Sequence, residues 1–317
     1  MLLARVSEEK YAHLYRGGKI VGGVFIGKGQ EALSAALGVS LRKGDVLAPL
    51  IRDQAARLAF GESLLDATRT YLGSRLGPMR GREGNVHRGR PQEGYLSMIS
   101  HLGAMIPAVA GVLFARKMKG ITGIVGATCL GDGGTSTGAF HEGLNYAAVE
   151  KLPLVMIVAN NQYAYSTPTA QQFACKDLVD KAVGYGVEGH SVDGTDLAAC
   201  LDVVSRAVAR ARDGHGPQLV VASLLRLGGH GEHDDAGYID EKLKRSHVGQ
   251  DCLKLAENFM IEQAWADSSD IEAWHKEAVR LTDESVATAQ REPAPDPNDE
   301  DWCALATRHL SEGVSEE

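Results

Sequence analysis

Two uninterrupted apolar segments near the middle of the chain constrain its fold most strongly. We predict buried strands at 121–130 and 154–159, separated by a helix at 134–150. The first strand ends at GDGG (131–134) and the second at NNQY (160–163). Apolar strands that alternate with helices are typical of parallel sheets covered on both faces. The chain is therefore predicted to have an α/β fold with a mostly parallel sheet.

The other elements follow from hydrophobic periodicity and from glycine and proline positions. We expect one α/β domain over 1–290 with a helical C-terminal part, followed by an extended acidic tail at 291–317. The segment 73–101 is rich in glycine and arginine and lacks periodicity, which favours an active-site or interface loop. Further helices are expected at 1–20, 30–41, 54–60, 104–119, 195–212 and within 240–290, and further strands at 46–50, 187–192 and 218–225.

Composition narrows the class of protein. The 317 residues carry a net charge of −8, which argues against a nucleic-acid binder. There is no apolar run long enough to span a membrane and no secretory signal, so we expect a cytoplasmic protein without a membrane partner. The cysteines have no CxxC spacing and predict neither zinc nor disulfides. The basic cluster Arg80, Arg82, Arg88 and Arg90 is either a solvated loop or a patch for a phosphorylated ligand or partner protein.

Polar residues at two neighbouring strand ends predict a metal site. Ligands of open parallel sheets bind at the carboxyl ends of the strands, where Asp132 and Asn161 are expected. Mg²⁺ prefers oxygen ligands, and the Tyr163 carbonyl could add a third. Glycines 131, 133 and 134 would let a diphosphate approach the backbone, and the following helix N-terminus would favour its charge. The alternative is that both runs are simple turns.

A dinucleotide-binding fingerprint fits these residues poorly. Ser136 stands where the third glycine of that fingerprint belongs, and no phosphate-binding lysine follows the glycines. A nucleotide-dependent oxidoreductase is therefore disfavoured.

With these motifs, residues 20–295 resemble the alpha subunit of the thiamine-diphosphate-dependent component of 2-oxo acid dehydrogenase complexes. That family includes pyruvate, branched-chain 2-oxo acid and acetoin dehydrogenases. The motifs that carry the resemblance are GDGG and NN, GQEA (29–32), RD (52–53), GNVH (84–87), YAYSTP (163–168), VDG (192–194) and RLGGH (226–230).

The resemblance implies a thiamine-diphosphate-binding fold and a set of site residues. Asp132, Asn161 and the Tyr163 carbonyl would hold Mg²⁺. Arg52 would contact the diphosphate, and Leu102 would support the aminopyrimidine side of the cofactor. His230 would approach the diphosphate and the reacting centre, which makes it the candidate catalytic residue.

The resemblance also implies partners and a reaction. The family's activating glutamate belongs to a beta chain, so the expected assembly is an alpha2-beta2 heterotetramer. It would decarboxylate pyruvate or a branched-chain 2-oxo acid oxidatively and pass the acyl group to lipoyl-lysine on an acyltransferase core. Acetoin cleavage and a non-catalytic cofactor-binding homologue are the alternatives.

Four positions depart from the family pattern. Ile51, Gln54 and Ala159 replace the tyrosine, histidine and charged residue that many members carry there. Gly231 follows His230 where regulated members have a phosphorylatable serine. The departures at Ile51 and Ala159 are the reason for considering a non-catalytic homologue. The role of His87 and the substrate side chain stay open.

Overall fold

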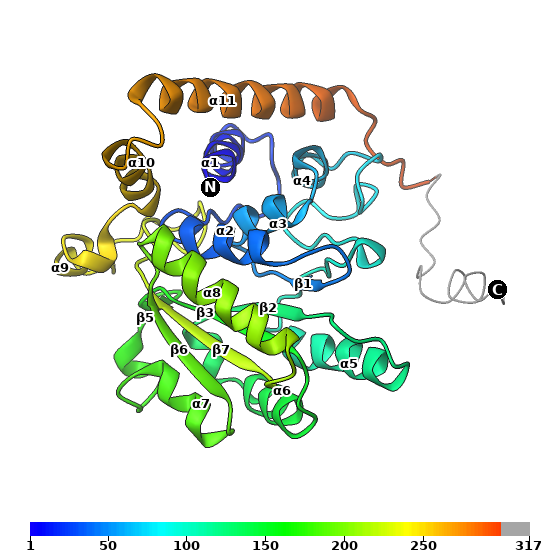
Figure 1. Cartoon of the computed structure of the whole chain (residues 1–317). Coiled ribbons are helices and arrows are strands. Elements are labelled where there is room, and N and C mark those ends of the chain that lie inside the picture. The colour runs from blue at the N-terminus through cyan, green and yellow to red at the C-terminus, as the bar shows by residue number, and fades with distance from the viewer. Residues whose placement is uncertain (299–317) are drawn as a thin grey trace.

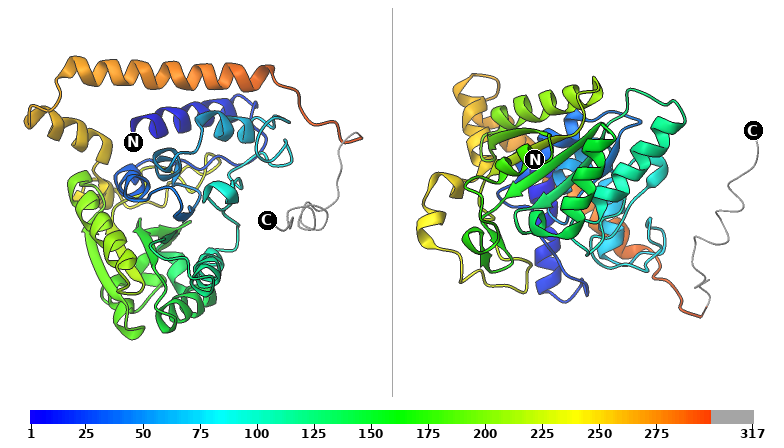
Figure 2. Two further views of the ribbon diagram at one scale, coloured as in Figure 1. Left: turned by 45° about the vertical axis from the view of Figure 1, so that its right-hand side comes forward. Right: turned by 90° about the horizontal axis from the view of Figure 1, so that it is seen from below.

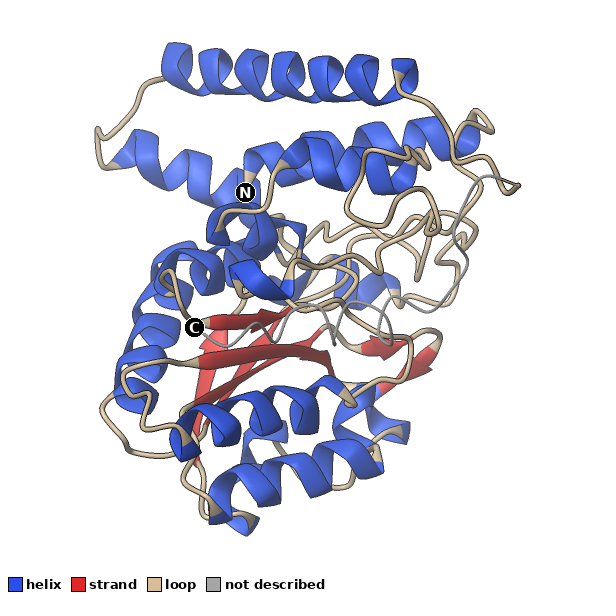
Figure 3. Ribbon diagram, turned by 90° about the vertical axis from the view of Figure 1, so that its right-hand side faces the viewer, coloured by secondary structure: helices blue, strands red, loops and turns tan. Residues whose placement is uncertain are grey.

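A five-stranded parallel sheet forms the centre of the molecule. The computed structural model describes residues 1–298. The strand order is β1-β2-β3-β7-β6, and each neighbouring pair is parallel. Helices cover both faces of the sheet (Figure 3), so the predicted α/β class is confirmed. The strands are β1 (Val46–Ala48), β2 (Gly126–Gly131), β3 (Leu154–Asn160), β6 (Glu188–Asp193) and β7 (Gln218–Ser223), and a separate hairpin pairs β4 (Tyr163–Ala164) with β5 (Thr167–Pro168).

The helices form two layers around the sheet and an outer layer above one of them (Figure 1). Helices α2 and α8 pack with one face of the sheet, and α5 and α6 pack with the other. The helices are α1 (Leu2–Arg16), α2 (Glu31–Ser40), α3 (Gln54–Phe60), α4 (Leu64–Tyr71), α5 (Met105–Met118), α6 (Gly138–Val149), α7 (Lys181–Gly184), α8 (Leu197–Arg212), α9 (Glu241–Lys244), α10 (Cys252–Glu262) and α11 (Ser268–Arg291).

The two faces of β3 show why the apolar pattern is continuous. Val155 and Ile157 belong to the core cluster shared with α2 and α8. Met156 and Val158 belong to the cluster shared with α5 and α6. Because successive strand residues point to opposite faces, a strand covered on both sides must be apolar at every position.

In the outer layer, the first and last helices of the described chain pack against each other. Helix α11 lies over α1 and runs past α4 (Figures 1 and 2). Asp267 caps α11, with its side chain accepting from the backbone of Asp270. Beyond α11, Glu292 accepts from Arg69 of α4, with Nε to Oε2 at 2.9 Å. The helices expected within 240–290 are present, and residues 299–317, most of the predicted tail, lie outside the described residues.

Several predicted boundaries are wrong for local reasons. Strand β2 begins at Gly126, not at 121, because Gly120 and Gly123 adopt left-handed φ angles of +70° and +72°. The helix expected from 134 begins at Gly138, after a 3₁₀ turn (Gly133–Ser136). Helix α4 and the β4–β5 hairpin were not predicted.

The arginine cluster of segment 73–101 is not a free basic patch. The Arg88 side chain is buried, and its Nη2 lies 2.8 Å from Glu62 Oε2. Arg90 Nε donates to Asp66 Oδ2 at 2.8 Å. Two of the four charges are therefore paired with carboxylates, Arg88 inside the protein and Arg90 near its surface, and fasten the loop to the α3–α4 region.

Residues 1–298 contain neither a disulfide bond nor a helix that could span a membrane. The four cysteines within it are free, and Cys129, Cys200 and Cys252 are buried; Cys303 lies outside it. None of the helices between residues 1 and 298 is both long and apolar enough to cross a bilayer.

Candidate functional site

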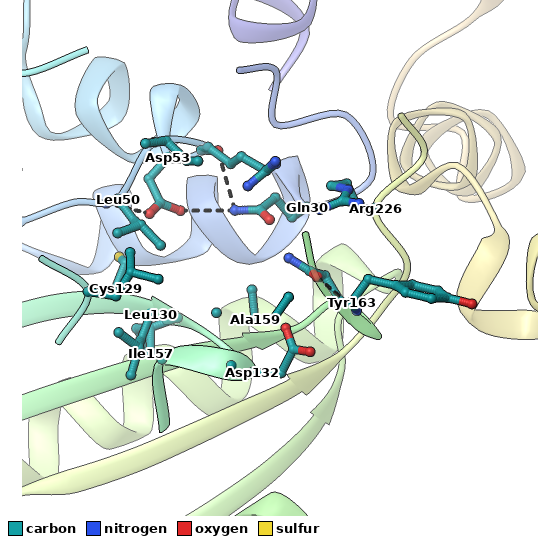
Figure 4. Close-up of a pocket in the computed structure, with 18 of the residues that line it drawn as sticks. Gln30, Leu50, Asp53, Cys129, Leu130, Asp132, Ile157, Ala159, Tyr163 and Arg226 are labelled. Carbon is teal, nitrogen blue, oxygen red and sulfur yellow. Dashed lines mark hydrogen bonds between the residues drawn. The ribbon is translucent and has the colours of Figure 1, made fainter. Parts of the chain in front are cut away.

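A cavity of about 300 Å³ lies at the carboxyl edge of the sheet. Asp132 lies below it, and Gln30 and Arg226 lie above it (Figure 4). Every residue predicted from the sequence to belong to the site lines this cavity. Those residues are Arg52, Leu102, Gly131, Asp132, Gly133, Gly134, Asn161, Tyr163 and His230.

One end of the cavity brings three oxygen-bearing groups together. In one orientation of the Asn161 side chain, its amide oxygen faces Asp132 and the Tyr163 carbonyl oxygen. If the amide is turned by 180°, its nitrogen instead donates to Asp132 Oδ1 at 3.2 Å and to the Tyr163 carbonyl oxygen at 3.0 Å. In the unturned orientation a carboxylate, an amide oxygen and a carbonyl oxygen converge. Such a set of hard oxygen donors suits Mg²⁺.

Asp132 supplies the only charge among these three groups. Its side chain is 1% exposed, and burial raises the pKa of the carboxyl group. A hydrogen bond from Gln172 Nε2 to Asp132 Oδ2, 2.7 Å long, opposes that shift. A cation beside the carboxylate would favour its charged form further.

The three glycines of GDGG differ in what surrounds them. A Cβ on Gly133 would overlap the Ala164 side chain, and one on Gly134 would overlap Leu130. A Cβ on Gly131 would meet nothing within 4 Å and would occupy part of the cavity. Packing therefore requires the two later glycines, whereas Gly131 leaves open space that a ligand could fill.

Another part of the cavity lining is cationic. Arg52 is buried, and its Nη2 donates to the His230 carbonyl oxygen. Burial and the nearby Arg226 charge lower the pKa of Arg52 to about 9. Within the described chain, Arg52 Nε is buried without a hydrogen-bond partner. An anion placed here would relieve both the desolvation and the repulsion between the two guanidinium groups.

Arg226 lines the cavity but was not identified from the sequence as a site residue. It begins the RLGGH motif just after β7, and it is buried. Its Nε donates to the Gly228 carbonyl at 3.0 Å and its Nη2 to the Tyr165 carbonyl at 2.9 Å. An arginine directly after the apolar segment 218–225 was a sequence signal that could have identified it.

His230 is held neutral by its surroundings. Burial, followed by the charges of Arg52 and Arg226, lowers the pKa of His230 to about 4. Its ring lies 4.6 Å from the Tyr165 ring, centroid to centroid. A neutral imidazole beside two arginines is a weak base, and a bound anion would raise its pKa.

The rim of the cavity is open and apolar. Leu102 is 46% exposed and Tyr165 is 47% exposed, although both line the cavity. Two of the departures from the family pattern, Ile51 and Ala159, also line it. His87 does not line the cavity; its Nε2 lies 3.0 Å from Ser100 Oγ, two residues before Leu102.

Comparison with known proteins defines the class. Residues 1–298 match the family model described as "Dehydrogenase E1 component", and the chain belongs to this family. Proteins of this family depend on thiamine diphosphate. The resemblance predicted from the motifs is confirmed: the chain is an alpha subunit of the 2-oxo acid dehydrogenase E1 type.

Its relatives differ in substrate at nearly equal similarity. The chain is 32% identical to the alpha subunit of acetoin:2,6-dichlorophenolindophenol oxidoreductase from Cupriavidus necator, over 94% of this chain and 90% of that protein. It is 31% identical to the 2-oxoisovalerate dehydrogenase alpha subunit of Bacillus subtilis, over 92% and 89%. It is 29% identical to the pyruvate dehydrogenase E1 alpha subunit of Rhizobium meliloti, over 93% and 85%.

Proposed function

We propose that this chain is the alpha subunit of a heteromeric 2-oxo acid dehydrogenase that decarboxylates pyruvate or a branched-chain 2-oxo acid oxidatively, with acyl transfer to lipoyl-lysine. One observation supports this most strongly. Asp132 Oδ1, the Asn161 side-chain amide and the Tyr163 carbonyl oxygen converge in a cavity that Arg52 and His230 also line. A magnesium diphosphate needs both kinds of group.

The donor set fits the cofactor that this function requires. Asp132, Asn161 and the Tyr163 carbonyl would hold Mg²⁺. The buried Nε of Arg52, which has no hydrogen-bond partner among residues 1–298, would face the diphosphate. When bound, thiamine diphosphate supplies the electron sink that loss of CO₂ from a 2-oxo acid requires.

The chain's own residues would position and protect this chemistry. Arg52 and Arg226 would supply positive charge to the diphosphate. His230 is neutral near pH 7 and can hold a proton at a ring nitrogen. Leu102 would support the aminopyrimidine side. The buried apolar wall, which includes Leu33 and Ile157, would help to exclude water once a partner covers the rim.

A beta subunit would complete the site, in an alpha2-beta2 heterotetramer that serves a lipoyl-bearing acyltransferase core. The exposed apolar side chains of Leu102 and Tyr165 at the cavity rim support a partner that covers them. The described chain contains a single parallel sheet, and therefore one of the two α/β units that the family's split site uses.

Acetoin cleavage is the second candidate function. The similarity to the Cupriavidus necator protein, whose name states acetoin as its substrate, supports it. Both functions would use the same metal and diphosphate residues, so they differ only in the group that reacts.

Comparing substrates tests the proposal. The chain would be purified with its beta subunit, and reduction of a dye acceptor would be followed with pyruvate, 3-methyl-2-oxobutanoate and acetoin. The proposal predicts the highest kcat/KM for a 2-oxo acid. A preference for acetoin would establish the second candidate, and cofactor binding without turnover of any of the three would indicate a non-catalytic homologue.

A further inference from the structure

Gln172 joins the two strand ends that carry the metal ligands. It follows the 3₁₀ turn η3 (Thr169–Gln171), which lies after the β4–β5 hairpin. Its Nε2 donates to Asp132 Oδ2 at 2.7 Å and to the Thr167 carbonyl at 2.8 Å. We propose that Gln172 is a positioning residue that sets the orientation of the Asp132 carboxylate toward Asn161 and Tyr163; this inference rests on the proposed metal site.

The contacts of Gln172 fix which way its amide points. Two acceptors, one on Asp132 and one on Thr167, face Nε2. Turning the amide by 180° would place its oxygen against both. Gln172 Oε1 is therefore left buried without a hydrogen-bond partner in the described chain. The amide is oriented by what its nitrogen donates to, and Asp132 is one of those two groups.

The main chain of Gln172 is tied to both ligand segments. Ser136, in the turn that follows Asp132, donates from Oγ to the Gln172 carbonyl at 2.8 Å. The Gln172 N–H donates to the Thr169 carbonyl at 3.0 Å, and the Thr169 N–H donates to the Gln162 carbonyl at 3.2 Å. Gln162 lies between Asn161 and Tyr163. A continuous set of hydrogen bonds therefore runs from the end of β2 to the end of β3.

This arrangement divides the two carboxylate oxygens of Asp132 between two tasks. Oδ2 accepts from Gln172, and Oδ1 is the atom that faces Asn161. A carboxylate held at one oxygen presents the other in a defined direction. Groups that orient a ligand in this way are important for metal affinity, and their loss costs about 10–100-fold.

The test is to replace Gln172 with methionine, which keeps the length of the side chain and removes the donor. The full-length chain, purified with any subunit that accompanies it, is titrated with Mn²⁺ in the presence of thiamine diphosphate, and bound metal is measured by electron paramagnetic resonance. We expect Gln172→Met to raise the Mn²⁺ dissociation constant about 10–100-fold. The metal-free melting temperature should fall by no more than about 4 °C, because buried Asp132 loses one donor while the 3₁₀ turn keeps its main-chain bonds.

Two further variants make the result specific. Gln171→Met alters the exposed neighbour in the same turn and should leave Mn²⁺ affinity unchanged. Ser136→Ala removes the main-chain anchor but keeps the amide, and should weaken Mn²⁺ binding measurably but less than loss of the donor does. If Gln172→Met unfolds the protein, Ser136→Ala decides the question.

The outcomes separate this inference from the proposed function. If Asp132→Ala abolishes Mn²⁺ binding while Gln172→Met and Ser136→Ala leave it unchanged, the positioning role is refuted and the metal site stands. If the loss of metal-binding free energy in Gln172→Met is no larger than its loss of unfolding free energy without metal, the role of Gln172 is structural. If the unmodified chain binds no Mn²⁺, the metal site itself is wrong, and this inference with it.

Discussion

Asp132 carries the only negative charge among the three proposed metal ligands, and it is buried. Removing it leaves two neutral oxygens, which hold a divalent cation weakly. We predict that Asp132→Ala lowers magnesium-dependent affinity for thiamine diphosphate by about 10–100-fold or more, extrapolating from the cost of losing groups that merely orient a ligand. Isothermal titration calorimetry measures this. Asp202→Ala, which removes a carboxylate exposed on α8, is the matched control and should bind as the unmodified chain does.

His230 gives the stability of the protein a defined pH dependence. Its pKa in the folded protein, about 4, lies below the ordinary value of 6.5. The unfolded chain therefore takes up a proton that the folded chain refuses, and the stability present above pH 6.5 is lost as the pH falls toward 4. We predict that His230→Gln flattens this decline, measured as the difference in urea-unfolding free energy between about pH 7 and about pH 5.

His247 provides a comparison of opposite sign. A hydrogen bond and ion pair with Asp193 raise the pKa of this exposed histidine. Its stabilising effect is full below the ordinary pKa and is lost as the pH rises through the folded value. His247→Gln should therefore make the protein less stable at the lower pH, which steepens the decline. If both substitutions changed the pH dependence of the unfolding free energy in the same direction, the lowered pKa assigned to His230 would be refuted.

At the scale of elements, two glycines of the turn after β2 have different roles. Gly133 is required for close packing, whereas Gly131 leaves space for a ligand. Gly133→Ala should force the β4–β5 hairpin away and lower the unfolding free energy by about 1–3 kcal/mol, a cost typical of overpacking. Gly131→Ala should leave stability unchanged or raise it by up to about 1 kcal/mol, because its Cβ has open space. It should nevertheless weaken cofactor binding, because the methyl group enters the cavity.

Denaturant unfolding and calorimetry on the same two variants provide the measurement. The expected results are that Gly133→Ala has the lower unfolding free energy, and that Gly131→Ala keeps its stability but binds the cofactor more weakly than the unmodified chain. Full cofactor affinity in Gly131→Ala would mean that the diphosphate lies elsewhere.

The buried strands were predictable because both faces of the sheet are covered. In β3 every position is buried up to Ala159, so the sequence is apolar without interruption. The β4–β5 hairpin could not be predicted, because each strand has two residues and its position depends on contacts with the GDGG turn. Helix α4 was missed because four of its eight residues are polar, and its buried face includes Asp66 and Thr68.

Site residues were likewise predictable only where the local sequence determines their position. Asp132 and Asn161 were identified because each follows an apolar strand, which fixes its place at the sheet edge. Arg52 and His230 were identified only through family resemblance, since they come from separate loops. Gln172 was missed because only the folded hairpin brings it next to Asp132.

At the scale of the whole molecule, the open rim of the cavity predicts dependence on a second subunit. With magnesium and thiamine diphosphate but without a partner, the chain should bind cofactor and show no steady-state decarboxylation of any 2-oxo acid. Addition of a beta subunit should restore turnover, measured as CO₂ release. Full turnover by the isolated chain would refute the split site.

The central claim is that Asp132, Asn161 and the Tyr163 carbonyl share one cation with the cofactor diphosphate. A crystal grown with Mn²⁺ and thiamine diphosphate tests it through anomalous scattering. The account predicts one strong peak about 2.0–2.3 Å from all three oxygen atoms, the range expected for a small divalent ion on oxygen ligands. A peak bound to other residues, or bound cofactor whose metal lacks Asp132 and Asn161, would contradict it.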